Sequence, residues 1–146
     1  MKPRPRNWCV ESEPSKQDMA VVSGGVIEAG RREAAGGDPR PVACFLREDG
    51  KIVAGACGRT EFGRLFVDFL WVAEDLRRLG LGTEALERLE EAARERGARD
   101  ALIETMSDRV AALYRRVGYR EIATIEAYVG QFTKHVLLKR LRRDEP

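Results

Sequence analysis

The chain has 146 residues, of which 43% are hydrophobic and 34% are charged, a balance typical of a soluble globular protein with one core. Its 26 basic and 24 acidic side chains leave a net charge of +2, which argues against a nucleic-acid partner. Three widely spaced cysteines and a single histidine, His135, argue against a disulfide framework, a metal site and a Ser-His-Asp triad. Because no apolar run is long enough to cross a membrane, we expect no membrane partner and a cytoplasmic location.

The N-terminal segment begins with a polar tail. Residues 1–6 carry two prolines and three basic side chains and are expected to be disordered, and residues 7–12, NWCVES, are expected to form a short edge strand. From Asp18 to Arg32, apolar residues recur at mixed three- and four-residue spacings, which predicts a helix with Asp18 as its N-cap. Residues 34–41, rich in glycine and proline, then predict a loop.

The middle of the chain predicts three strands and a helix. Residues 42–60 form two apolar runs about Asp49 and Gly50, which tolerate positive φ, and so predict a β-hairpin. Residues 65–72, LFVDFLWV, predict a strand buried on both faces, so that three consecutive strands form an antiparallel meander. Apolar residues at helical spacing predict a helix from Gly82 to Arg96, ended by Gly97.

The last third alternates strands with a short helix. Residues 100–106 predict a strand, residues 108–117 an amphipathic helix ended by Gly118, residues 119–129 a strand and turn, and residues 134–141 a closing strand. Strands that are antiparallel first and then joined through a helix indicate an α/β (α+β) fold: a mixed, mostly antiparallel central sheet of about six to seven strands flanked by helices. Because no linker divides the chain, residues 1–146 are expected to form a single domain.

The stretch RRLGLGTEA, from Arg77 to Ala85, places two arginines and two glycines in front of a predicted helix. A helix start exposes unpaired N–H groups, and Gly80 and Gly82 keep side chains away from them, which indicates a site for a phosphate or pyrophosphate. A plain helix cap with solvated arginines is the alternative. A dinucleotide-binding turn would match G-x-G-x-x-A with Glu104 as its acidic residue, but the spacer AEDLRRL after Val72 and the hairpin upstream argue against it.

A buried strand, a seven-residue spacer and Arg-x-x-Gly-x-Gly at the start of a helix resemble the GNAT superfamily of acyl-CoA-dependent N-acyltransferases. The family signature, Gln/Arg-x-x-Gly-x-Gly/Ala, is met from Arg77 to Gly82. The stretch SDRVAALYRRVGY is similar to the family's later helix, usually written Asn-x-x-Ala-x-x-Leu-Tyr-x-x-x-Gly-Phe, although Ser107 and Val110 depart from it. The resemblance extends over about residues 43–141 and implies the GNAT-like acyl-CoA N-acyltransferase fold.

The resemblance also implies what each part binds. Acetyl-CoA would be the co-substrate, its pyrophosphate would lie on the N–H groups of the glycine-rich turn, and its pantetheine arm would pair with main-chain groups of the preceding strand. A nearby N–H would polarise the thioester carbonyl, where charge develops during acyl transfer. The residues implied in acetyl-CoA binding are Leu70, Val72, Arg77, Arg78, Gly80, Leu81, Gly82 and Thr83.

Three residues are candidates for proton transfer. Tyr114 aligns with the tyrosine that protonates the departing coenzyme A sulfur in many relatives; alternatively, it packs on the apolar face of its helix. Asp68 interrupts the apolar strand, shares a face with Leu70 and Val72, and is the first candidate for the base that deprotonates the amine, with Glu104 as the second. Either carboxylate could instead bind the substrate's positive charge or pair with an arginine, and the solvent could take the proton.

In relatives, the acceptor pocket combines the first helical region with the loop between the last two strands. The residues expected to line it here are Glu126, Tyr128, Gln131 and Phe132. Cys44 and Cys57 are expected to be buried apolar residues, and His135 is expected to be packed within the closing strand or to lie at its edge.

The resemblance therefore implies an enzyme, an acetyl-CoA-dependent N-acetyltransferase that acetylates a primary amine of a small molecule or peptide by direct attack in a ternary complex. The alternative is a non-catalytic acyl-CoA-binding or structural GNAT-like module. Many relatives dimerise through the last strand, so a homodimer is an option. The identity of the amine and the preferred acyl chain stay open.

Overall fold

The computed structural model describes residues 1–34 and 37–142, and residue contacts divide the chain into an N-terminal unit and a sheet unit that begins at Gly37. The N-terminal unit contains one helix, α1 (Lys16–Glu33), whose residues are all solvent-exposed. Ser15 caps this helix, because its Oγ accepts the N–H of Asp18 at 3.0 Å, so the prediction of Asp18 as the cap is wrong. The expectation of a single domain over residues 1–146 stays a prediction.

Two other expectations for the first part of the chain are corrected. Residues 7–12 are exposed and form no strand. The loop predicted over residues 34–41 ends earlier, because strand pairing already begins at Arg40. Residues 35 and 36 of that loop, like residues 143–146, lie outside the described part of the chain.

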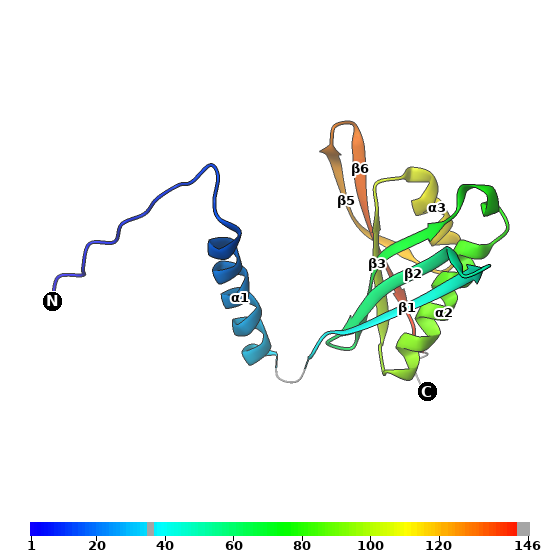
Figure 1. Cartoon of the computed structure of the whole chain (residues 1–146), viewed down its shortest axis with the longest axis horizontal. Helices are drawn as coiled ribbons and strands as arrows, with labels where there is room; N and C mark the ends of the chain where they lie inside the picture. The colour runs from blue at the N-terminus through cyan, green and yellow to red at the C-terminus, as the bar shows by residue number, and fades with distance from the viewer. Residues whose placement is uncertain (35–36, 143–146) are drawn as a thin grey trace. The chain divides into compact units, whose positions relative to one another are not determined.

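Within the described residues, the sheet unit is built on six strands in the order β1-β2-β3-β4-β6-β5 (Figure 1). β3 and β4 run parallel, and the other neighbouring strands are antiparallel. The strands are β1 (Arg40–Glu48), β2 (Lys51–Glu61), β3 (Arg64–Val72), β4 (Asp100–Thr105), β5 (Arg120–Val129) and β6 (Phe132–Arg140). This mixed, mostly antiparallel sheet confirms the predicted fold class.

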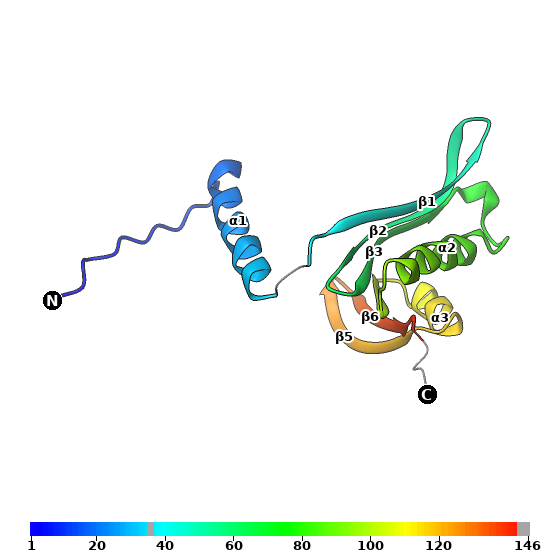
Figure 2. The same cartoon turned by 90° about the horizontal axis from the view of Figure 1, so that it is seen from below.

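Two helices of the sheet unit lie on the same face of the sheet (Figure 2). α2 (Leu81–Glu95) packs on β1, β2 and β3, and α3 (Asp108–Arg116) packs on β4, β5 and β6. A short 3-10 helix, η1 (Glu74–Leu76), joins β3 to α2. The core fills the space between the helices and the sheet, and its most deeply buried apolar side chains are Leu65, Leu86, Leu89 and Leu137.

Residues with positive φ mark the ends of several elements. Gly97 and Gly118 follow α2 and α3 with φ of 85° and 104°, which confirms the predicted helix ends. Asp49 and Gly50, at the β1–β2 turn, have φ of 50° and 77°, the combination that a tight two-residue hairpin requires. The sequence pattern therefore located these turns correctly.

The predicted burial of β3 on both faces is only partly correct. Leu65 and Val67 are buried, whereas Phe69 and Trp71 in the second half of the strand are 74% and 51% exposed. The reason is that both helices of the sheet unit lie on one face, so apolar side chains on the other face are left open within this unit.

A buried ionic network crosses the core between α2 and β6. Glu90 of α2 is 1% exposed, and its carboxylate accepts a hydrogen bond from the Tyr119 hydroxyl at 2.8 Å and one from Lys139 Nζ at 2.8 Å. Burial beside this carboxylate raises the pKa of Tyr119, so the phenol stays protonated and keeps donating. Both oxygens of the buried Glu90 are thus satisfied, and the pairing fixes the helix against the strand.

We expect Glu90→Leu to lower the free energy of unfolding by about 1–3 kcal/mol, because it leaves the buried Tyr119 hydroxyl without its acceptor and the half-buried Lys139 ammonium without its counter-ion. Glu87→Leu, an exposed carboxylate on the same helix, should change stability by less than about 0.5 kcal/mol. Adding Lys139→Met to Glu90→Leu should restore the part of the loss that comes from the unpaired ammonium, but not the part that comes from the Tyr119 hydroxyl. Urea denaturation of the four proteins measures the differences; equal stabilities for the two single variants would contradict the role of the network.

Candidate active site

The sheet opens between its two parallel strands. In the described part of the chain, β3 pairs with β4 only through Arg64, Leu65 and Phe66, although β3 continues to Val72 and β4 to Thr105. Beyond Phe66, β3 therefore presents main-chain groups that β4 does not engage. Such groups can bind an extended ligand as if it were another strand.

A β-bulge at Asp68 bends β3 beside this opening. Cys57 of β2 lies opposite Phe69 and the next residue, Gly58, lies opposite Val67, so Asp68 is an extra residue without a partner in the register. A Cβ at Gly58 would lie 2.1 Å from the carbonyl oxygen of Phe66, so only glycine allows this close approach. The glycine at position 58 of β2 thus permits the bulge.

The glycine-rich turn follows the end of β3 and starts α2. Arg78 has φ of 67° and Gly80 has φ of 77°, and Gly80 is the N-cap residue of α2 without any side-chain capping bond. The first N–H groups of the helix, on Leu81, Gly82 and Thr83, therefore lack both an intrahelical acceptor and a side-chain cap. Together with the helix dipole, they form a site suited to a phosphate group.

Arg77 fixes the turn against the strand. Its Nε donates a hydrogen bond of 3.1 Å to the carbonyl oxygen of Val72, the last residue of β3. A Cβ at Gly82 would lie only 3.6 Å from a methyl group of Val72, so the first turn of α2 sits directly on the same residue. The anion site and the opening beside β3 are consequently held next to each other.

Tyr114 lies in the core on α3. Ser107 caps this helix, because its Oγ accepts the N–H of Val110 at 3.2 Å, so the serine still supplies a capping bond where relatives usually have asparagine. The Tyr114 side chain is 5% exposed, and its ring centroid lies 6.0 Å from that of Tyr119. Burial raises the pKa of the Tyr114 phenol, which therefore carries its proton at neutral pH.

The bulge changes the position expected for Asp68. Before the bulge, the side chains of Leu65 and Val67 point into the core. After the bulge, Leu70 packs on the core, where regular alternation would have placed Phe69, so the alternation of inward and outward side chains shifts by one residue. Asp68 therefore does not share a face with Leu70, contrary to the expectation from regular alternation. It is solvent-exposed, and its Oδ1 accepts a hydrogen bond of 3.3 Å from Arg59.

Glu104 is also paired with a cation. Its Oε2 lies 2.8 Å from Nζ of Lys134 on the neighbouring strand β6, and its side chain is 48% exposed. Lys134 Nζ also lies 4.6 Å from the ring centre of Tyr128, so this residue, predicted to line the acceptor pocket, lies next to the Glu104–Lys134 ion pair. Both candidate bases are thus exposed carboxylates held in ion pairs.

The turn between β5 and β6 brings two predicted acceptor residues to a pocket. Gln131 and Phe132 line a pocket of about 420 Å³ together with residues at the start of α3. The other two predicted residues, Glu126 and Tyr128, are exposed near the end of β5 and do not line it. The remaining lining residues are Met106, Ser107, Asp108 and Thr133.

His135 makes a link that the sequence did not indicate. Its Nε2 lies 2.7 Å from Oδ1 of Asp108 on α3, and its Nδ1 contacts the Glu121 carboxylate on β5. Arg115 of α3 donates to the other oxygen of Glu121 at 2.8 Å. The Glu121 and Asp108 carboxylates raise the pKa of His135, so the imidazolium ties α3 to both strands of the hairpin. These residues are far apart in the sequence, and no local pattern relates them.

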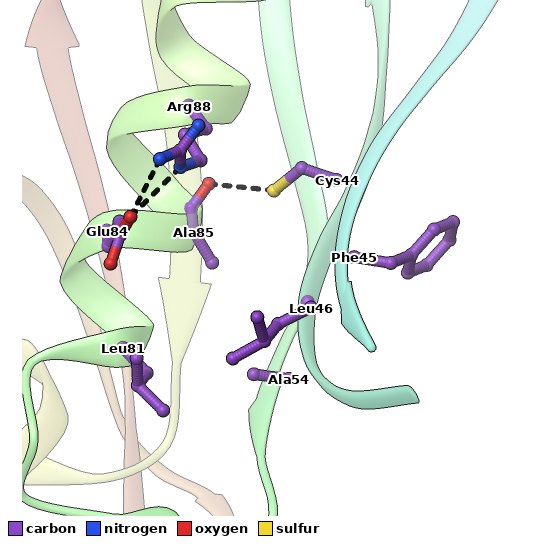
Figure 3. Close-up of a pocket in the computed structure, with 9 residues that line it drawn as sticks. Cys44, Phe45, Leu46, Ala54, Leu81, Glu84, Ala85 and Arg88 are labelled. Carbon is purple, nitrogen blue, oxygen red and sulfur yellow. Dashed lines mark hydrogen bonds and ion pairs between the residues drawn. The ribbon is translucent and has the colours of Figure 1, made fainter. Parts of the chain in front are cut away.

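A second pocket lies between α2 and the β1–β2 hairpin (Figure 3). It measures about 290 Å³ and is lined by the side chains of Leu81 and Cys44, among others. Leu81 therefore uses its side chain here, so its part in an anion site would fall to its N–H group. Cys44 and Cys57 are half-buried rather than buried as expected, and Cys44 Sγ donates to the carbonyl oxygen of Ala85 at 3.0 Å.

The described part of the chain was also compared with the requirements of a disulfide, a metal site and a membrane-spanning helix. All three cysteines are free thiols. Across residues 1–34 and 37–142, no three His, Cys, Asp or Glu side chains are grouped so that they could hold a metal ion. No helix in the same part of the chain has the length and apolar character needed to cross a membrane.

Comparison with known proteins gives consistent matches. The sequence model of the Acetyltransferase (GNAT) family matches residues 8–119. The blasticidin-S acetyltransferase of Streptomyces morookaense is 38% identical over 142 residues, which cover 94% of this chain and 97% of that protein. An acetyltransferase from Bacillus cereus ATCC 14579 superposes with a TM-score of 0.81 at 26% identity, over 90% of this chain and 97% of that one. A GNAT family acetyltransferase from Elizabethkingia anophelis with acetyl-CoA bound shares the fold, with a TM-score of 0.59 at 15% identity over 90% of this chain and 94% of that one.

We expect the link through His135 to make stability depend on pH. Because the folded-state pKa of His135 is raised above the unfolded value, its contribution is complete below about pH 6.5 and is lost as the pH rises through the folded pKa. His135→Gln should therefore destabilise the protein more at about pH 6 than at about pH 8, as measured by urea denaturation at both pH values. His135 is the single histidine, so parallel pH profiles for the two proteins would contradict this assignment.

Proposed function

Because the chain belongs to the GNAT acetyltransferase family, we propose that it transfers the acetyl group of acetyl-CoA to a primary amine by direct attack in a ternary complex. The observation that supports this most directly is the juxtaposition of two features. An uncapped helix start suited to phosphate lies directly beside a strand whose main-chain groups are open to an extended ligand. Coenzyme A has both parts, a pyrophosphate and a pantetheine arm.

The binding residues proposed for acetyl-CoA follow from this arrangement. Its pyrophosphate would accept hydrogen bonds from the N–H groups of Leu81, Gly82 and Thr83, with the positive charges of Arg77 and Arg78 nearby. Its pantetheine arm would run along β3 past the main chain of Leu70 and Val72. The carbonyl of Val72 already accepts a bond from Arg77, so a ligand there would share that acceptor.

The proposed reaction forms a bond between the amine nitrogen and the thioester carbon and then breaks the bond from that carbon to sulfur. A main-chain N–H at the bulge of β3 would stabilise the negative charge on the carbonyl oxygen in the transition state. The Tyr114 phenol carries its proton at neutral pH and would give it to the leaving thiolate. The amine would lose its proton to Asp68, to Glu104 or to the solvent, and the ion pairs of both carboxylates make the solvent an equal candidate.

The acceptor is proposed to be a small amine or a peptide amine. The blasticidin-S acetyltransferase matches nearly the whole chain, so blasticidin S is the first acceptor to test. A non-catalytic acyl-CoA-binding module remains the alternative. The enzyme is favoured because Tyr114 and the glycine-rich turn are both present in the fold.

We expect Tyr114→Phe to lower kcat for acetyl transfer by about 10²-fold or more, with little change in KM for acetyl-CoA, because the variant loses the proton donor but not the binding groups. The assay is thiol release from acetyl-CoA with blasticidin S and a panel of simple amines. Tyr119→Phe is the matched control: its ring neighbours Tyr114, and its hydroxyl bonds to Glu90, so it should lose stability but keep kcat.

Equal kcat values for the two variants would contradict the acid role of Tyr114. If the unmodified protein binds coenzyme A tightly but releases no thiol with any amine, the non-catalytic module is the better description. Localisation in the cytoplasm and a homodimer stay predictions, and size-exclusion chromatography with light scattering would determine the oligomeric state.

A further inference from the structure

The pocket between the start of α3 and the β5–β6 turn has a single charged lining residue, Asp108, within the described part of the chain. The other lining residues are Met106, Ser107, Gln131, Phe132 and Thr133, which are all neutral. Asp108 is therefore the lining residue that can attract a cation. Its side chain is 88% exposed, so a ligand in the pocket can reach it.

Asp108 is exposed but held in place from behind. His135 is 9% exposed and donates its Nε2–H to Oδ1 of Asp108 at 2.7 Å. The other ring nitrogen contacts Glu121, which in turn accepts a bond from Arg115 at 2.8 Å. A chain of ionic contacts thus fixes one oxygen of Asp108. Fixing a side chain before binding reduces the entropy lost when a ligand binds.

The neutral groups in the pocket also suit a cation. Phe132 is 53% exposed and offers an aromatic face, and Gln131 offers an amide oxygen. The nearest cation, the His135 imidazolium, contacts only Oδ1 of Asp108, so Oδ2 is available to a ligand. Lys134 is paired with Glu104 at 2.8 Å. A carboxylate, an aromatic face and an amide together form a site typical of ammonium and guanidinium groups.

We propose that this pocket binds a positively charged group of the acceptor, with Asp108 as its counter-ion and His135 as the positioning residue for Asp108. The inference rests on the proposed function, because it assumes that the acceptor enters beside α3. If the pocket binds a cation in this way, the preferred substrates are amines that carry a second positive charge. That second charge would bind Asp108 while the reacting amine attacks the thioester.

The test compares putrescine, a diamine, with butylamine, which has the same chain length and lacks the second charge. We expect Asp108→Asn to raise KM for putrescine about three- to fivefold, as for an exposed ion pair, and KM for butylamine less than about 1.5-fold. The values of kcat and of KM for acetyl-CoA should stay unchanged. Asp108→Glu should restore part of the preference, and His135→Gln should reduce it less than Asp108→Asn does.

Two further variants serve as controls for the effect of Asp108→Asn. Glu95→Gln removes an exposed carboxylate on α2, outside the pocket, and should leave both KM values unchanged. Phe132→Leu leaves all the ion pairs intact, so it tests the pocket even if Asp108→Asn is poorly folded; it should also weaken putrescine more than butylamine. If Asp108→Asn and Phe132→Leu change the kinetics of the two amines equally, the proposal is overturned.

Binding of putrescine to the coenzyme A complex, measured by isothermal titration calorimetry, separates this inference from the proposed function. Binding that depends on Asp108, in a protein that transfers no acetyl group, would support the cation site and reject the enzyme. Acetyl transfer without any preference for putrescine would support the enzyme and reject the cation site. Absence of both transfer and putrescine binding would reject both.

Discussion

The early separation of β3 from β4 is the constraint on which the proposed site depends. The two strands are parallel, so a crossover connection must join them, and its helix α2 begins just beyond the end of β3, where the strands have already parted. The dipole and unpaired N–H groups of α2 therefore lie at the open end of the sheet. The bulge at Asp68 and the contact between Arg77 and Val72 then hold the strand and the turn in this geometry.

The other half of the site depends on α3, a helix of nine residues. An isolated helix of this length is unstable in water, so its position comes from tertiary contacts. Ala111 and Tyr114 bury its inner face, and Asp108 and Arg115 connect its outer groups to His135 and Glu121 on the hairpin. The phenol proposed as the acid and the pocket proposed for the acceptor are thus positioned by the same short helix.

Most of the fold could be predicted because its signals are local. The periodicity of apolar residues located α2 and α3 almost to the residue, and residues such as Gly97 and Gly118 marked where each helix ends. The geometry of the candidate site could not be predicted in the same way, because it depends on contacts between segments that are far apart in the sequence. The position of Asp68 depends on Gly58 across the strand pair, and no regular alternation shows a bulge. The partners of His135 lie on α3 and β5, so no spacing pattern in the sequence predicts these contacts.

The close approach at Gly58 also has a consequence for how relatives of this protein can differ. A side chain at this position would collide with the backbone of β3, which no rotamer change can relieve, so this position beside the proposed acetyl-CoA site has to remain glycine. The β5–β6 hairpin is different, because Ile125, Glu126 and Val129 all project into solvent and can be exchanged at little cost in stability. New acceptors can therefore arise through changes in the hairpin while the donor half of the molecule is preserved.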